Sequence, residues 1–84
     1  MVMVEFTAEA KRELEDVPLV IRLRCYEIVE RLQGWPDISG AKPLRGGLKG
    51  CFRIRTGDWR IVFRPEGSVI WIVRIDNRKD VYER

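Results

Sequence analysis

The first third of the chain passes from alternating to helical periodicity. Residues 2–6 alternate apolar and polar side chains and predict a short strand. Thr7 is suited to cap a helix over about residues 8–16, because its hydroxyl can accept a free amide of the first turn. Pro18 ends that helix and opens a second one, with Gly34 following its C-terminal end. The apolar stripe of the second helix is Ile21, Cys25, Ile28, Val29 and Leu32.

The second half of the chain has the two-residue period of β-strands. Residues 52–55 and 59–64 alternate apolar and basic side chains, and residues 69–75 are nearly all apolar, as in a central strand. Short turns rich in Gly, Asp and Pro separate the three segments. The pattern therefore predicts a meander of three antiparallel strands.

A segment between the two halves lacks either period. Residues 34–50 hold five of the seven glycines and predict a long loop, of the kind that is usually functional or disordered. Together the segments predict a single domain over residues 1–84, in the order β-α-α-β-β-β. We expect an α+β fold in which two N-terminal helices pack on one face of an antiparallel sheet.

Several classes of protein are disfavoured by composition. The chain has no apolar run of membrane-spanning length, and its N-terminus lacks the basic start of a secretory signal. It contains no histidine and only two cysteines, Cys25 and Cys51, which argues against a zinc site. The composition favours a reduced, cytoplasmic protein that does not bind membranes, and we expect no cofactor. Cys25 is predicted to lie in the core, and without a histidine Cys51 is a poor candidate nucleophile.

Charge is distributed unevenly along the chain. Residues 1–33 carry seven acidic and five basic side chains, whereas residues 42–79 carry ten basic and three acidic ones. Such an asymmetry indicates an anionic partner for the second half.

The arginines of the strands have two interpretations. The period of two places Arg53 and Arg55 on one side of a strand, and Arg60 and Arg64 on one side of the next. If both pairs face away from the helices, they form a platform of guanidinium groups suited to phosphate. The alternative is the solvated face of an ordinary sheet, where basic residues protect against aggregation. Asp58 is the single acidic residue within residues 49–64, which is too few to neutralise the group of arginines.

The remaining aromatic and C-terminal residues also have a structural and a functional interpretation. Trp59 and Trp71 are in phase with the strands and predict packing, and Trp35 predicts an anchor for the loop. Base stacking by Trp35 or Trp59 is the alternative. Arg78 and Tyr82 follow the last strand and could lie beside the platform, or be a solvated strand end and a lid over the core.

Read in order, four segments resemble the RelE/ParE toxin family of bacterial toxin–antitoxin modules. They are FTAEAKRELEDVP after the first strand, IVERLQGWP, KPLRGGLKGCFRIRTGDWRIVF and the closing IDNRKDVY. The similarity covers nearly the whole chain, and the β-α-α-β-β-β order agrees with the fold that it implies. It also implies the toxin component of a type II module.

The resemblance implies a site as well. Ribonuclease members cut mRNA, typically in the ribosomal decoding site and without a metal, by attack of the 2′-OH on the adjacent phosphate. By this resemblance Arg60 stabilises the phosphate, Arg78 is the acid or charge stabiliser, and Tyr82 is the base or a positioning group. We expect nearby guanidiniums to favour the phenolate of Tyr82. The residues that we predict to bind RNA or phosphate are Arg45, Lys49, Arg53 and Arg55.

The sequence departs from the family pattern in two places. Asn77 stands where many members have a histidine, and the chain stops at Arg84 without the C-terminal helix of some relatives. Other members also lack that histidine.

The leading hypothesis is a metal-independent endoribonuclease that cleaves ribosome-bound mRNA and is neutralised by a small acidic antitoxin. One alternative is a toxin of the ParE kind that binds DNA gyrase. Another is a non-catalytic RNA- or ribosome-binding protein of the same fold. A homodimer and a toxin–antitoxin hetero-oligomer both remain open.

Overall fold

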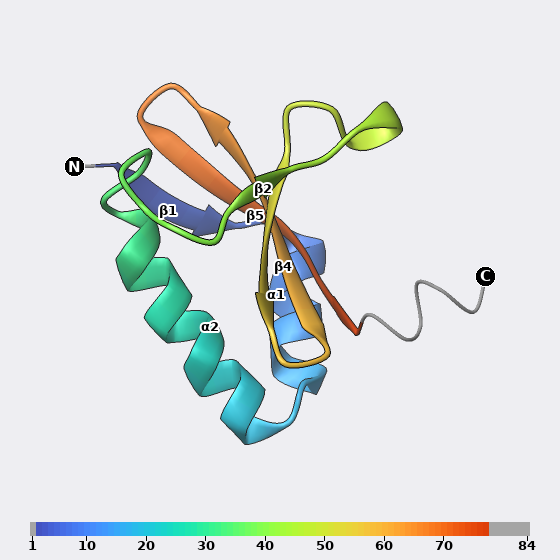
Figure 1. Cartoon of the computed structure of the whole chain (residues 1–84). Helices are drawn as coiled ribbons and strands as arrows, with labels where there is room; N and C mark the ends of the chain where they lie inside the picture. Colours follow the sequence, from blue (N-terminus) through green and yellow to red (C-terminus); the bar gives the residue numbers. More distant parts are fainter. Residues whose placement is uncertain (1, 78–84) are drawn as a thin grey trace.

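The computed structural model describes residues 2–77 and has the predicted order of elements, with a short strand and a 3₁₀ helix added between the second helix and the meander (Figure 1). The elements are β1 (Met3–Phe6), α1 (Ala8–Asp16), α2 (Leu19–Leu32), β2 (Lys42–Pro43), the 3₁₀ helix η1 (Gly46–Leu48), β3 (Phe52–Thr56), β4 (Trp59–Glu66) and β5 (Val69–Asn77). Thr7 caps α1 as expected, because its hydroxyl oxygen accepts the Ala10 N–H at 3.2 Å. Gly34 follows the end of α2 but does not take the positive φ typical of a glycine there.

The sheet is mixed rather than antiparallel. Its strand order is β1-β5-β4-β3-β2, and the meander of β3, β4 and β5 is antiparallel as predicted. β1, however, pairs in parallel with β5, from Met3 opposite Val69 to Phe6 opposite Ile72. The expectation of a wholly antiparallel sheet was therefore wrong. Alternation along β1 is the same for a parallel and an antiparallel neighbour, so it carries no signal of direction.

The predicted loop at residues 34–50 contains structure of its own. Lys42 and Pro43 pair with β3 as a short edge strand, a position that proline tolerates because its missing N–H faces away from the sheet. After η1 the chain returns to β3, and the Cys51 N–H donates to the Leu48 carbonyl at 2.9 Å. Gly46 and Gly50 make these turns with φ of 68° and 94°, which glycine adopts without strain.

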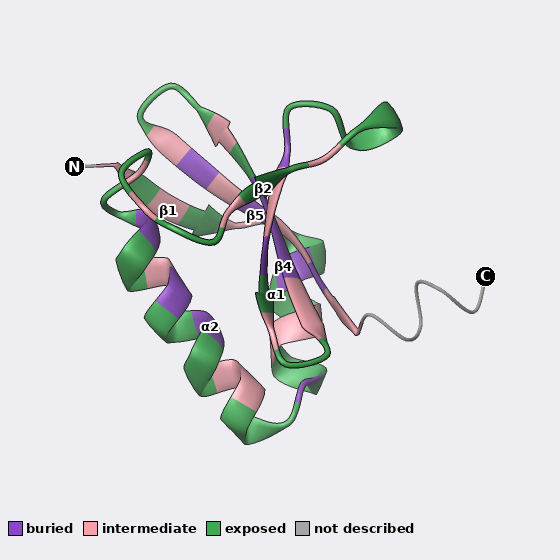
Figure 2. Ribbon diagram, in the orientation of Figure 1, coloured by how far each residue is buried: buried purple, intermediate pink, exposed green. Residues whose placement is uncertain are grey.

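Both helices cover the same face of the sheet. Ala10 of α1 and Cys25, Ile28 and Leu32 of α2 form one buried cluster with the inward side chains of β3, β4 and β5 (Figure 2). Those strand residues are Ile54, Ile61, Phe63, Ile70, Ile72 and Ile75.

Trp35 closes this core from the segment after α2. Its ring meets Phe52 and Phe63 edge-on, with centroids 4.8 and 5.2 Å away. The prediction that Trp35 anchors the loop is confirmed, although its ring contacts are with the sheet rather than with the helix pair over which we expected it.

Cys25 is a free, buried thiol, as predicted for a core position. Burial raises its pKa from 9.0 to about 11, because the thiolate would lose its hydration. The Cys25 thiol of the unfolded chain ionises first, so we expect this thiol to leave the free energy of unfolding unchanged below pH 9 and to lower it between pH 9 and about pH 11. Chemical denaturation across this range should show that the free energy of unfolding declines by on the order of 1 kcal/mol per pH unit. Cys25→Ala should remove this decline. An equal decline in Cys25→Ala would contradict the prediction.

Candidate phosphate-binding face

The sheet's outer face, opposite the helices, carries the arginines of the meander. Residues paired across strands point to the same side, and Ile54 and Ile61 point into the core. Arg55 therefore lies beside Arg60 on the outer face, and Arg53 lies beside Val62. We call the outer-facing set the arginine face: Arg53, Arg55, Arg60, Arg64 and Arg74. The register that the platform requires, with Arg53, Arg55, Arg60 and Arg64 on one face, is thus the one observed.

Val62 lies at the centre of the arginine face and is only 1% exposed. Arg53 on β3 and Arg74 on β5 lie directly opposite it, and Arg60 and Arg64 lie two positions before and after it. Arginine stems can cover apolar surface while their charged ends stay at the surface. Val62 is thus a small apolar centre among these four arginines.

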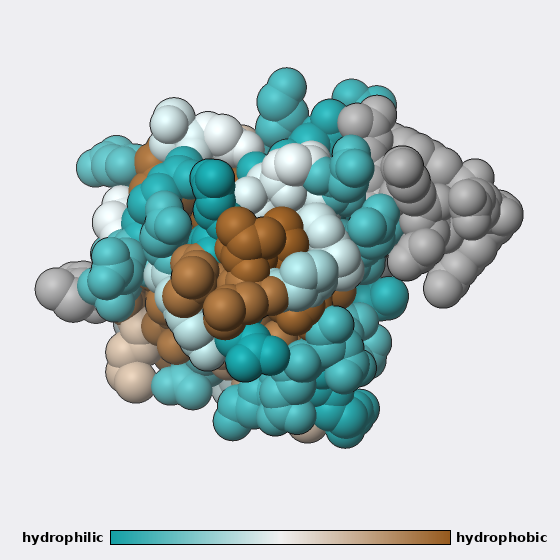
Figure 3. Space-filling model, turned by 90° about the horizontal axis from the view of Figure 1, so that it is seen from below, coloured by the Kyte–Doolittle hydropathy of each residue, from teal (hydrophilic) through white to brown (hydrophobic). Residues whose placement is uncertain are grey.

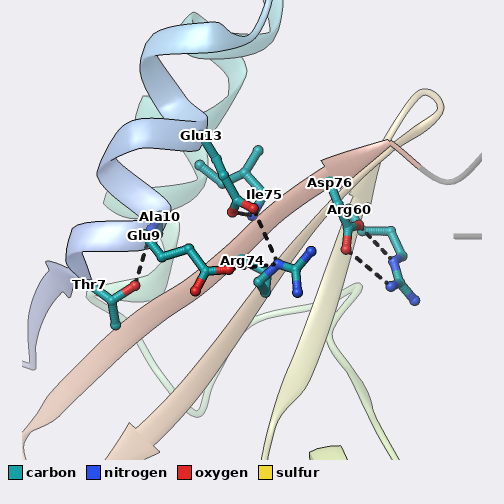
Figure 4. A network of polar contacts seen from close by, with 8 residues as sticks. All are labelled: Thr7, Glu9, Ala10, Glu13, Arg60, Arg74, Ile75 and Asp76. Carbon is teal, nitrogen blue, oxygen red and sulfur yellow. Dashed lines mark hydrogen bonds and ion pairs between the residues drawn. The ribbon is translucent and has the colours of Figure 1, made fainter. Parts of the chain in front are cut away.

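Arg60 forms the best-defined ion pair of the face. Its Nε lies 3.1 Å from Asp76 Oδ1, and its Nη2 lies 3.4 Å from Asp76 Oδ2 (Figure 4). The two side chains are 18% and 14% exposed. The expectation that the arginines lack neutralising acids was wrong in this respect, because it considered acids near in sequence and Asp76 comes from the neighbouring strand β5.

Arg64 is held more loosely. Its Nη1 lies 3.5 Å from Glu66 Oε2, and both side chains are about half exposed, 51% and 53%. Pairs of this kind contribute little, since water competes for both ions. A hydrogen bond to Cys51 and then the Glu66 carboxylate raise the pKa of the Arg64 guanidinium. Cys51 itself is 1% exposed, so its thiol is poorly placed to attack a substrate.

Arg74 is engaged with α1. Its Nε lies 3.2 Å from Glu13 Oε2 and 3.6 Å from Glu9 Oε1. Glu13 also accepts the Ile75 N–H at 2.7 Å, beyond the point where β1 stops pairing with β5 (Figure 4). These contacts fasten α1 to the edge of β5, so Arg74 has a structural role.

Arg55 lies at the margin between the arginine face and α2. Its side chain is exposed and makes no hydrogen bond or ion pair with any residue in 2–77. It borders a cavity of about 140 Å³ between β3 and α2. The other lining residues are Arg24, Glu27, Ile28, Arg31 and Thr56. Basic groups therefore predominate around Arg55.

Two other predicted site residues, Arg45 and Lys49, lie away from Arg60. Arg45 and Lys49 are exposed and flank η1, next to Cys51 at the Arg64 end of the face. Arg60 and Arg64 are four residues apart on one strand, which corresponds to about 13 Å. Arg78 and Tyr82 lie outside the described residues.

Two residues of this outer face were not predicted from the sequence as site candidates. Asp76 pairs with Arg60, and half-buried Trp71 lies opposite Arg64 on the outer face. The period of two along β5 could have found Trp71, because its neighbours Ile70 and Ile72 are both in the core. Trp59 and Trp35 pack against the core, which favours the packing interpretation for both.

A second surface feature lies on α2. Leu19, Val20, Leu23 and Tyr26 are 67%, 58%, 52% and 48% exposed, a high value for large hydrophobic side chains. α2 begins at the lower end of the molecule in Figure 1, and Figure 3 shows hydrophobic side chains gathered on that side and ringed by hydrophilic ones.

Within residues 2–77, no three acidic or cysteine side chains come together in an arrangement that could hold a metal ion. No helix in the same range combines the length and the apolar character needed to cross a bilayer.

Comparison with known proteins gives one consistent family. The family model described as ParE toxin of type II toxin-antitoxin system, parDE, matches residues 4–82. Toxin RelG of Mycobacterium tuberculosis is 34% identical over 83 residues, covering 96% of this chain and 95% of that toxin.

Solved structures agree. A chain in the crystal structure of the toxin-antitoxin complex RelBE2 from Mycobacterium tuberculosis is 32% identical, with a TM-score of 0.77 and coverage of 93% and 94% of the two chains. The isolated Escherichia coli RelE toxin has the same fold, with a TM-score of 0.77 at 20% identity and coverage of 99% and 93%. The chain therefore belongs to the RelE/ParE family of type II toxins.

Proposed function

We propose that the protein is a metal-independent endoribonuclease that cleaves mRNA on the ribosome in the cytoplasm. The observation that supports this most is the cross-strand pair of Arg55 and Arg60 on the outer face. Like charges directly opposite each other destabilise a sheet. A bound anion between the two guanidiniums would remove this repulsion. A phosphodiester is an anion of suitable geometry for two guanidiniums.

The chemistry proposed is transesterification within the RNA. The 2′-oxygen attacks the adjacent phosphorus, its proton passes to a base, and the 5′-oxygen leaves with a proton from an acid. Arg60 would stabilise the charge that develops on the phosphoryl oxygens, with Arg55 and Arg53 holding the backbone. Tyr82 and Arg78 remain the proposed base and acid, and Arg45 and Lys49 would contact RNA further along.

The test is inducible expression in a bacterial host, with growth and mRNA 5′ ends read in the same cultures. The wild type should arrest growth and produce new 5′ ends within translated reading frames, and Tyr82→Phe should reduce both. Growth arrest with intact mRNA would refute the ribonuclease proposal. Arrest by neither protein, with ribosome binding retained, would favour a non-catalytic binding protein.

A second candidate function is binding of DNA gyrase. It is favoured by one observation, the match of residues 4–82 to a family model described for the toxin of parDE. Measuring DNA breaks after induction separates the two candidates. Breaks that accumulate while mRNA stays intact would support the gyrase-binding function.

We further propose that a small antitoxin holds the protein inactive. The solved relatives include toxin–antitoxin complexes, and the arginine face offers positive charge to an acidic segment. The exposed side chains of α2 lie on the same element as Arg24 and Arg31. An amphipathic acidic segment could therefore bury its apolar side on α2 and pair its carboxylates with the adjacent arginines.

Leu23→Glu tests this contact. A buried, unpaired carboxylate is costly, so we expect affinity for the co-expressed antitoxin to fall at least tenfold while toxicity persists. The antitoxin is taken as the product of the neighbouring small reading frame, and affinity is measured by titration of the purified proteins. Met3→Glu on β1, where Met3 is 60% exposed, is the control. Equal losses in both variants, or none in Leu23→Glu, would contradict the proposed docking surface.

A further inference from the structure

Asp76 lies directly opposite Arg60, one member of the proposed phosphate-binding pair of Arg55 and Arg60. The outer-face row runs Arg55, Arg60, Asp76 across β3, β4 and β5. We infer that Asp76 is a positioning residue, which fixes the Arg60 guanidinium with one edge turned to the substrate phosphate. This assignment rests on the proposed ribonuclease function and adds a residue that does not itself touch RNA.

The atoms engaged by Asp76 decide which edge remains for substrate. A guanidinium offers one pair of parallel donors at Nε and Nη2 and another at Nη1 and Nη2. Asp76 occupies the first pair, at 3.1 Å from Nε and 3.4 Å from Nη2 (Figure 4). The Nη1–Nη2 edge is left to bind two phosphate oxygens side by side, which is the preferred geometry for arginine and phosphate.

The two neighbours of Arg60 in this row determine toward which strand its guanidinium is drawn. Arg55 lies on one side of Arg60 in the row and repels it, whereas Asp76 lies on the other side and attracts it. Both forces move the Arg60 guanidinium toward β5 and away from Arg55. The two guanidiniums are thereby kept apart, and an anion rather than direct contact can join them.

The strand that carries Asp76 is itself held in place. Residues 74 and 75, which precede it, are fastened to α1 through Glu13, with Arg74 Nε at 3.2 Å and the Ile75 N–H at 2.7 Å. The Arg60–Asp76 pair is also largely shielded, with side chains 18% and 14% exposed, unlike the half-exposed pair of Arg64 and Glu66. A rigid strand and limited hydration allow the carboxylate to define a single position for Arg60, as preorganised sites require.

The decisive experiment is a double-mutant cycle on mRNA cleavage by purified protein and programmed ribosomes. Asp76→Ala and Asp76→Asn should lower kcat about 10- to 100-fold, the loss expected from a misplaced charge-stabilising group, with little change in KM. In an Arg60→Ala background, Asp76→Ala should change kcat less than twofold. Asp58→Ala is the matched control, since it removes an exposed carboxylate from the turn next to Arg60 and should leave kcat unchanged.

A purely structural role for Asp76 would give losses that multiply in the double mutant, and this result would overturn the inference. Higher activity in Asp76→Ala would also overturn it, because it would mean that the carboxylate competes with phosphate. Thermal unfolding of each variant identifies any that fail to fold, and Asp76→Asn keeps the shape of the side chain.

A second measurement does not depend on cleavage. The ¹⁵N-detected Nε–H signal of Arg60 should exchange slowly with water in the wild type and rapidly in Asp76→Ala, which removes the acceptor oxygen. Adding an oligonucleotide with a 2′-deoxy group, which cannot be cleaved, should shift the Nη signals of Arg60 and leave its Nε–H protected. Rapid exchange in the wild type overturns the inference, whereas protected exchange without mRNA cleavage by the wild type overturns the ribonuclease proposal alone.

Discussion

Arg60→Ala is expected to lower the rate of mRNA cleavage about 10²- to 10³-fold, the usual cost of removing one preorganised donor from a developing negative charge. Arg60 is the arginine of the outer face whose position is best defined, through both oxygens of Asp76. Single-turnover cleavage of mRNA on programmed ribosomes measures the chemical step directly. Growth arrest on induction should be lost in parallel.

Arg60→Lys separates the contribution of the positive charge from that of the guanidinium geometry. Lysine keeps the charge but has a single donor head, so it cannot engage Asp76 and a phosphate with two parallel edges. We expect Arg60→Lys to recover only a small part of the lost rate. Arg12→Ala, which removes an exposed arginine from α1, is the control for net charge. Full activity of Arg60→Ala would show that the arginine face is not the catalytic centre.

Phe63→Ala is expected to lower the free energy of unfolding by about 3–5 kcal/mol, the range for a large aromatic side chain removed from a core. Phe63 is fully buried in β4, and its ring contacts Trp35 and Phe52, with centroids 5.2 and 5.8 Å away. The substitution would leave a cavity where three aromatic rings meet. Urea denaturation followed by tryptophan fluorescence measures the change.

Two further variants calibrate that loss. Phe63→Leu retains most of the volume and should be less destabilising than Phe63→Ala. Val20→Ala truncates a side chain that is 58% exposed on α2 and should change stability by less than about 0.5 kcal/mol. A comparable loss for Val20→Ala and Phe63→Ala would contradict the proposed position of the core.

The local pattern of the sequence was enough to predict the order of the longer helices and strands, and which side chains share a side of each strand. Thr7 and Pro18 marked the helix starts, and alternation put Arg53 and Arg55 on one side of β3 and Arg60 and Arg64 on one side of β4. These features depend on residues close together in the chain. The periods of 2 and 3.6 residues report them directly.

Contacts between distant segments required the tertiary structure. The parallel pairing of β1 with β5 joins residues more than sixty positions apart, and alternation does not encode its direction. β2 was hidden because two residues are too few to show a period. Both features follow from which strands become neighbours, which is decided when the helices and sheet pack.

The sequence by itself determined that Arg53 and Arg55 share one side of a strand, and that Arg60 and Arg64 share one side of the next, since side-chain direction in a strand follows from the backbone period. The register of the folded sheet placed both pairs on the same face. Only the tertiary structure decided how they are balanced. Asp76 reaches Arg60 from β5, sixteen positions away, whereas Arg74 turns to Glu9 and Glu13 on α1. The physical reason is that a charge is neutralised by whichever carboxylate lies within a few ångströms in space, and separation along the chain does not set that distance.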